Sequence, residues 1–300
     1  MSLSDFWLFL QQGVLSGLVT GSVYALLALA IVIVFKTTDV PNFSQGELFM
    51  AGAYVALMLV LVADWPQYAV IPATLGAIAL VAATFQRVVL RQVARSRGVG
   101  VQFVIATLGL AYLLKGLVRT TGLGDTPRSL PALVPSGSVT IGQGTLTYLD
   151  LAILSVAVAA MLLLFAMFRW SRVGKAMRAV GMNPKAARLV GISLGRMHIL
   201  VWALAGLLGA IAALLIAPKI LVSPEIAHLA ILAYAAAIVG GFTSLPGAVL
   251  GGFVIGIAEN LVGLFVSTNA IVVAPFVAIM LVLLLRPQGL LGGRPQVKKV

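Results

Sequence analysis

The segment RWSRVGKAMRAVGMNPKAARLVGISLGR, from Arg169 to Arg196, is the longest strongly polar stretch of an otherwise apolar chain. It contains no acidic residue and seven basic ones, namely Arg169, Arg172, Lys175, Arg178, Lys185, Arg188 and Arg196. Loops rich in Lys and Arg beside membrane helices face the cytoplasm. We therefore expect this segment on the cytoplasmic side, and we orient the rest of the chain around it.

Apolar residues recur at helical spacing on both sides of a break at Gly181-Met182-Asn183-Pro184. They are Val173, Met177 and Val180 before the break, and Ala186, Leu189 and Val190 after it. The pattern predicts two short helices, the second with Asn183 as its N-cap and Pro184 at its first position. Such an amphipathic helix pair on a cytoplasmic face is suited to docking a soluble partner.

The composition excludes an ordinary soluble domain. Hydrophobic residues make up 61% of the chain and charged residues only 9%, whereas soluble proteins carry about 25% charged residues. Several uninterrupted apolar runs approach the roughly 20 residues that a helix needs to cross a bilayer. The alternating pattern of a membrane β-barrel is absent. The sequence therefore predicts an all-α polytopic membrane protein.

The net charge of +12 follows from membrane topology. Fifteen of the 20 Lys and Arg residues lie in three stretches without Asp or Glu: residues 87–97, residues 169–196, and a tail containing Arg286, Arg294, Lys298 and Lys299. This asymmetry is typical of cytoplasmic loops. We therefore expect a lipid bilayer, and no nucleic acid, as the partner of these charges.

Nine apolar segments predict a single membrane domain over residues 1–300. They cover residues 13–35, 47–62, 67–85, 101–118, 149–168, 197–217, 227–242, 247–266 and 271–285 approximately. Nine crossings place the N-terminus outside and the C-terminus in the cytoplasm. If the segment after Gly46 is re-entrant, the count is eight and the N-terminus lies inside. The loop at 120–147 is predicted to be external, with a small hairpin near residues 138–146.

Small residues predict close helix packing in two segments. Gly13, Gly17 and Gly21 recur at every fourth position of the first one. The Gly-rich segment at 247–266 carries Gly247, Gly252 and Gly256. Small-xxx-small patterns let helix backbones approach one another in membranes.

Two carboxylates stand out because ionisable residues inside a membrane are costly. Glu259, followed by Asn260, shares a helix face with Gly252 and Gly256, which favours a bundle interior or a water-filled path. A structural position near the membrane boundary would also explain Glu259. Lys115 and Arg119, four residues apart near the outer end of a segment, are interpreted as cations that extend to the membrane surface.

The second carboxylate, Glu47, follows a polar turn that begins a helix. The candidates for lining or gating a pathway there are Asn42, Phe43, Gln45, Gly46 and Glu47. Capping offers a second interpretation, since Ser44 to Glu47 matches the Ser/Thr-x-x-Glu capping box and carboxylates are favoured at helix N-termini.

The motifs of common enzymes are missing from the sequence. There is no GxxxxGK[S/T] phosphate loop, no HExxH and no convincing nucleophile–base arrangement. The chain contains no cysteine, and its two histidines, His198 and His228, lack metal-ligand spacing. We therefore expect no catalytic residue, no metal site and no ATPase activity in this chain.

Four motifs resemble those of branched-chain amino acid ABC permeases, the smaller of their two membrane subunits. They are NFSQGELFMAGAYVA (42–56), RVGKAMRAVGMNPKAARLVGIS (172–193), GGFTSLPGAVLGGFVIGIAENL (240–261) and RPQGLLG (286–292). The resemblance covers essentially the whole chain in order. It implies the ABC importer permease fold, a bacterial inner-membrane location and ATP-driven import.

The resemblance also implies partners. These are a second, related permease, two cytoplasmic ABC ATPases that bind ATP and Mg, and a periplasmic substrate-binding protein. The ATPases would dock on the segment at 169–196. The coupling candidates there are Arg172, Lys175, Met177, Arg178, Met182, Asn183, Ala186, Ala187, Arg188 and Gly191. Val173, Met177, Met182 and Leu189 are expected to supply the apolar contacts.

The sequence leaves one alternative for the transported substrate and one for the energy source of transport. Ser44-Gln45-Gly46-Glu47 stands where family members commonly have a pattern such as Ala-His-Gly-Glu, and urea or short-chain amide permeases share the architecture. Import of branched-chain or other hydrophobic amino acids is therefore the main prediction, with urea or amides as the alternative. An ion-driven secondary transporter, with Glu47 or Glu259 as its proton site, is the competing class.

Overall fold

The computed structural model describes residues 3–95, 100–124, 126–132 and 134–293. Of the predicted basic stretches, Arg97, Arg294, Lys298 and Lys299 lie outside these ranges. The first half contains α1 (Leu3–Thr38), α2 (Gln45–Leu61), α3 (Gln67–Phe85), the π-helical turn η1 (Gln86–Leu90), α4 (Arg91–Arg95) and α5 (Gly100–Thr120).

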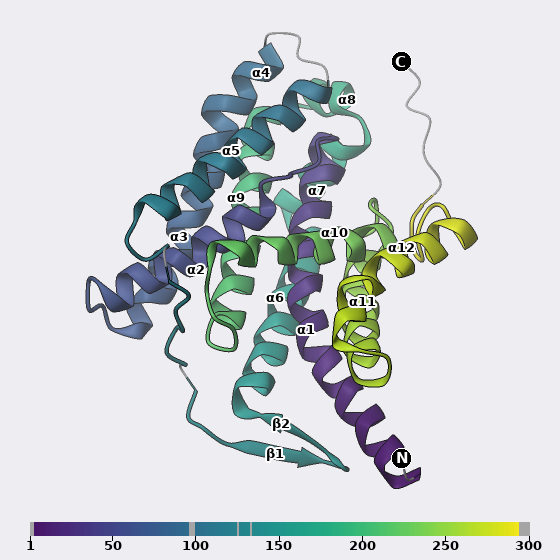
Figure 1. The fold of residues 1–300 in the computed structure, drawn as a ribbon. Coiled ribbons are helices and arrows are strands. Elements are labelled where there is room, and N and C mark those ends of the chain that lie inside the picture. The colour runs from purple at the N-terminus through teal and green to yellow at the C-terminus, as the bar shows by residue number, and fades with distance from the viewer. Residues whose placement is uncertain (1–2, 96–99, 125, 133, 294–300) are drawn as a thin grey trace.

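The second half begins with a hairpin and continues with helices (Figure 1). Its elements are β1 (Ser138–Ile141), β2 (Gly144–Thr147), α6 (Tyr148–Trp170), α7 (Arg172–Met182), α8 (Pro184–Leu189), α9 (Leu194–Ile216), the 3-10 helix η2 (Pro224–His228), α10 (Leu229–Gly240), α11 (Leu245–Phe265), the 3-10 helix η3 (Thr268–Val272) and α12 (Ala274–Leu285).

The helices confirm the predicted membrane fold. Each of the nine predicted apolar segments is helical. Within the described ranges, six helices are long and apolar enough to cross a bilayer: α1, α3 continued through η1 and α4, α5, α6, α9 and α11. Three apolar helices are shorter, namely α2, η2–α10 and α12.

Helix α1 forms the centre of the bundle, and α10 lies across it (Figure 1). Every residue from Ala25 to Val34 is buried. This stretch is apolar on all sides, as expected of a helix surrounded by other helices. Helices α9, α10 and α11 pack around it.

The predicted glycines lie where α1 crosses α11. A methyl group at Gly17 would lie 2.5 Å from the Ile257 Cα, and one at Gly256 would lie 2.4 Å from the Gly21 Cα. Added Cβ atoms at Gly13 and Gly252 would likewise meet atoms of the facing helix. Gly247 instead packs against α10. Close backbone approach is what small residues allow in membrane helices.

The bundle has two distinct ends. At the hairpin end, the Gln11 Nε2 donates to the Ile141 carbonyl at 2.6 Å, and the Thr145 N–H donates to the Gln12 Oε1 at 2.9 Å. The first turns of α1 and the predicted hairpin, in which Val139 pairs with Leu146, therefore lie together. At the basic end, the last turn of α1 meets α7, because a Cβ at Gly181 would lie 2.6 Å from the Lys36 carbonyl oxygen.

Candidate functional site

The segment Arg169–Arg196 has the predicted helix–turn–helix form, as α7 and α8. The Asn183 Oδ1 accepts from the Ala186 N–H at 3.0 Å, and Pro184 begins α8. The Ser171 Oγ caps α7 in the same way, accepting from the Gly174 N–H at 2.9 Å. The local sequence thus determines both helix starts.

The exposed side chains of this segment form one charged and apolar surface. Leu189 is 89% and Met182 is 69% exposed. The other predicted coupling and contact residues that are exposed are Arg172, Val173, Lys175, Arg178, Asn183, Ala186, Arg188 and Gly191. An exposed leucine at the polar end of a membrane bundle is suited to a contact with a partner protein, which would bury it. We call this set of residues the docking surface.

Two predicted members do not belong to the docking surface. Met177 is 1% and Ala187 is 3% exposed, so both side chains pack within this chain and cannot touch a partner in this conformation. Helical periodicity identified an apolar face with Met177 and Val180 on α7, and this face turns inward, whereas the predicted apolar face of α8, with Leu189 and Val190, is exposed. The prediction that Met177 contacts a partner is therefore wrong for this conformation. Ala187, predicted as a coupling residue, packs inside this chain instead.

Helix α7 is held closely by its neighbours. A Cβ at Gly174 would lie 2.3 Å from the Met167 carbonyl oxygen of α6, and Gly181 contacts the end of α1 in the same manner. Two glycines thus bring the α7 backbone against the ends of two long helices. Helix α7 is therefore packed directly against both α1 and α6.

The polar turn before α2 is buried inside the bundle. Asn42, Ser44 and Gln45 have no exposed surface. The Asn42 Oδ1 accepts from the Ser44 N–H at 3.2 Å and from its hydroxyl at 2.7 Å, while the Asn42 Nδ2 donates to the Gln45 Oε1 at 3.0 Å. The Gln45 Nε2 donates to the Ala205 carbonyl of α9 at 3.1 Å. These bonds fix α2 to α9 and satisfy the buried polar groups.

The capping-box interpretation of this turn is wrong. The Ser44 side chain makes no capping bond to α2, because its hydroxyl donates to Asn42 instead. Glu47 is half-buried near Lys115 and Tyr234. Phe43 stacks on Tyr234, with ring centroids 5.4 Å apart.

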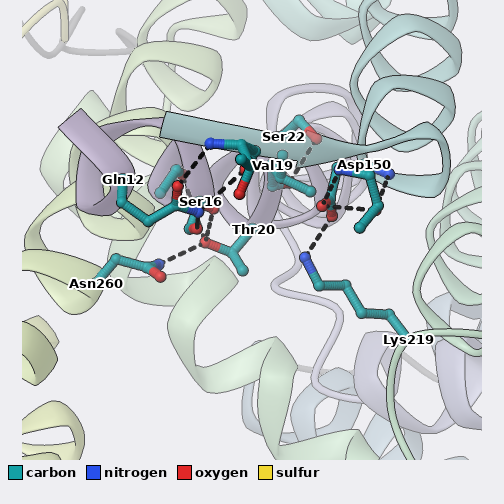
Figure 2. A network of polar contacts seen from close by, with 11 residues as sticks. Gln12, Ser16, Val19, Thr20, Ser22, Asp150, Lys219 and Asn260 are labelled. Carbon is teal, nitrogen blue, oxygen red and sulfur yellow. Dashed lines mark hydrogen bonds and ion pairs between the residues drawn. The ribbon is translucent and has the colours of Figure 1, made fainter. Parts of the chain in front are cut away.

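Glu259 and Asn260 lie against a polar stripe of α1. The Asn260 Nδ2 donates to the Thr20 Oγ1 at 2.9 Å (Figure 2). The Tyr24 hydroxyl lies beside the Glu259 carboxylate. The buried Glu259 Oε2 has no hydrogen-bond partner among the described residues. An ionisable residue inside a membrane bundle is costly and is a candidate functional position for that reason.

The sequence contains a signal for this stripe that the sequence analysis missed. Gln12, Ser16, Thr20 and Tyr24 recur at every fourth position, directly beside the glycines at 13, 17 and 21. Figure 2 shows this stripe from Gln12 to Thr20, with Asn260 reaching it from α11. The Gln12 Nε2 lies 3.3 Å from the Ser16 Oγ.

A cavity of about 320 Å³ adjoins the stripe. Thr20, Tyr24, Glu225 and His228 are among its lining residues. It connects the Glu259 cluster with η2. We call the stripe, the Glu259–Asn260 pair and this cavity the polar path. Glu47 is not among the lining residues of this cavity, but its neighbour Lys115 contacts Glu225, which does line it.

Lys115 and Arg119 extend to an exposed position, in agreement with their interpretation as surface-seeking cations, and the structure adds a partner there. Both contact the Glu225 carboxylate, with N···O distances of 3.2 Å each. Their partner lies about 110 residues away in the chain, beyond the reach of local patterns. A third ion pair joins Lys219 to the nearly buried Asp150 at the start of α6 (Figure 2).

Comparisons with known proteins agree with this architecture. The family model "Branched-chain amino acid transport system / permease component" matches residues 13–285. The high-affinity branched-chain amino acid transport system permease protein LivH of Escherichia coli K12 is 33% identical, with 99% of this chain and 100% of LivH covered. The corresponding protein BraD of Pseudomonas aeruginosa is 30% identical, with 99% of each chain covered.

One solved structure shares the fold. PsaBC from Streptococcus pneumoniae, solved in complex with Fab, superimposes with a TM-score of 0.51 over 93% of this chain and 92% of that one. The sequence identity is 16%, so this likeness concerns the helical arrangement alone.

Proposed function

This chain belongs to the branched-chain amino acid transport system permease family, and we propose from this membership that it is the membrane-spanning subunit of an ATP-driven importer of branched-chain amino acids. The full-length relationship to LivH and BraD is the observation that carries the proposal. The chain supplies the membrane path, while ATP and Mg bind to partner subunits.

The docking surface supports ATPase coupling. It combines an almost fully exposed leucine with exposed basic side chains at one end of the bundle. An acidic partner surface with an apolar cleft would complement it. Two ABC ATPases, one on this chain and one on a second homologous permease, would therefore bind through α7 and α8 of each subunit.

We infer the orientation in a bacterial inner membrane from the basic end of the bundle. The docking surface and the last turn of α1 lie at this end of the bundle. Because this end is rich in Lys and Arg, we assign it to the cytoplasmic side. The C-terminal motif lies there too, because the Leu290 N–H donates to the Val239 carbonyl at 2.8 Å and Phe242 contacts Phe35 of α1. We place the C-terminus in the cytoplasm and the hairpin end toward a periplasmic binding protein.

The proposed mechanism links the docking surface to the polar path through α1. ATPase closure shifts α7, whose glycine contacts pass the movement to α1 and α6 as a rigid-body change. Helix α1 carries the polar stripe and packs on α11, which carries Glu259. In this mechanism the Glu259 carboxylate attracts the ammonium group of an amino acid that enters from the hairpin end.

A pull-down tests the assembly first. The tagged chain is purified from its native host in mild detergent, and mass spectrometry identifies what accompanies it. A second polytopic permease with P-loop ATPases is the expected result. Recovery of this chain alone, or as a homo-oligomer, would contradict the importer and favour an ion-driven carrier.

Reconstitution then tests coupling and substrate. The complex in liposomes should show ATPase activity stimulated by the binding protein with leucine, and L189D should abolish this stimulation while L189M retains it. Stimulation by urea or acetamide instead would transfer the proposal to the amide permeases. Normal stimulation in a folded, correctly inserted L189D variant would remove the docking assignment.

A further inference from the structure

A second basic feature at the basic end is a cavity of about 640 Å³ between η1–α4 and α8–α9. Five arginines line it together with His198: Arg87, Arg91, Arg95, Arg188 and Arg196. The first three arginines recur at every fourth residue, so they face the same side of their helix. Arg188 and Arg196 come from the opposite wall. We call this feature the arginine cavity.

The arginine cavity gathers positive charge from two sides. The described residues that line it include no Asp or Glu. The three ion pairs found in the described ranges involve Lys115, Arg119 and Lys219, and none of the five arginines. Arg is always charged and prefers bidentate contacts with phosphate and carboxylate groups. Five converging guanidinium groups therefore form a site for an anion with several oxygens.

The surroundings of the cavity indicate where that anion comes from. Its walls are the last turns of the spanning segment Gln67–Arg95 and the first turns of the spanning helix α9. Val88, Val89 and Leu200, on the same turns, are exposed apolar side chains. Leu194 and Ile199 line the cavity itself. The arginines thus lie at the depth where lipid headgroups meet acyl chains, and basic pockets between membrane helices suit anionic headgroups.

We propose that the arginine cavity binds the phosphate headgroup of an anionic phospholipid from the cytoplasmic leaflet, with its acyl chains along Val88, Val89 and Leu200. The arginines neutralise the phosphate, and His198 and Ser193 are placed to add hydrogen bonds. Because Arg188 belongs to α8, a bound headgroup would also hold the docking surface against α9 and α4. Only this last consequence rests on the proposed function; lipid binding does not.

Native mass spectrometry of the full chain in detergent tests the site without any transport partner. The delipidated protein is titrated with dioleoyl phosphatidylglycerol or dioleoyl phosphatidylcholine, which differ only in headgroup. Each juxtamembrane arginine contributes roughly fivefold in affinity. R91Q/R196Q should therefore weaken phosphatidylglycerol binding about 25-fold. The control R169Q/R286Q removes two exposed arginines outside the cavity and should bind like the wild type.

Several results would overturn the proposal. Equal binding of the two lipids to the wild type would do so, even if the double variant misfolded. So would equal loss in R91Q/R196Q and R169Q/R286Q, which would indicate general surface charge. Complete competition by millimolar inorganic phosphate would assign the cavity to a soluble anion. If R91Q/R196Q bound lipid normally but no longer co-purified with the ATPase, the arginine cavity would be a contact site for the ATPase partner instead.

Discussion

Replacing Gly256 with alanine tests the α1–α11 contact on which the bundle depends. The new methyl group would lie 2.4 Å from the Cα and N of Gly21 and 2.6 Å from the Gly17 carbonyl oxygen. Ordinary contacts between carbon atoms begin at about 3.5 Å. The two backbones must therefore separate by about 1 Å. Overpacking of this kind typically costs about 1–3 kcal/mol in the free energy of unfolding.

The matched control is the same substitution at Gly109 in α5. A Cβ there meets nothing within 4 Å. Alanine inside a helix is more stable than glycine by about 0.5–1 kcal/mol. G109A should thus raise the stability slightly while G256A lowers it. The opposite signs separate the steric effect from intrinsic helix propensity.

Thermal unfolding in one detergent provides the assay. Intrinsic tryptophan fluorescence and size-exclusion chromatography after heating report the midpoint for the wild type, G256A and G109A. We expect the midpoint of G256A to fall and that of G109A to stay or rise. A G256A midpoint equal to that of the wild type would refute the close backbone contact between α1 and α11.

Three further substitutions test other contacts. K219M leaves the nearly buried Asp150 carboxylate without its cation and should lower stability by about 2 kcal/mol in the same assay; an unchanged midpoint would show that the pair is open to solvent. N42A removes the acceptor of both Ser44 bonds and the donor to Gln45, and should lower the free energy of unfolding by about 1–3 kcal/mol; N42D should also be destabilised, because it loses the donor and buries a carboxylate, and an unchanged midpoint in both variants would contradict this network. E259Q should lower leucine uptake by the reconstituted complex roughly tenfold, or 1.4 kcal/mol, at unchanged stability; lost stability with normal uptake would make Glu259 structural.

The sequence alone determined the features that depend on local composition and periodicity. The nine apolar segments were visible because a helix in lipid must be apolar over its own length. The α7–α8 pair was visible through helical spacing and the Asn183-Pro184 start, and the hairpin through its alternation. Even the packing glycines were identified, since close approach needs a repeating small residue on one face.

Only the tertiary structure decided which face of each element is covered, and by what. Met177 and Ala187 looked like partner contacts but turn inward, because α7 and α8 fold onto their own bundle. Ser44 fits a capping box in sequence, yet its hydroxyl donates to Asn42. Periodicity defines an apolar face, but the burial of that face depends on neighbours distant in the chain.

The polar partnerships likewise required three dimensions. Glu225 meets Lys115 and Arg119 only because η2 folds back onto α5. Thr20 meets Asn260, and Arg91 shares a cavity with Arg196, through helices that are far apart in sequence. A single sequence shows which side chains carry charge or hydrogen bonds. Which of them meet is set by the packing of helices, since membrane helices are joined mainly by contacts between distant segments.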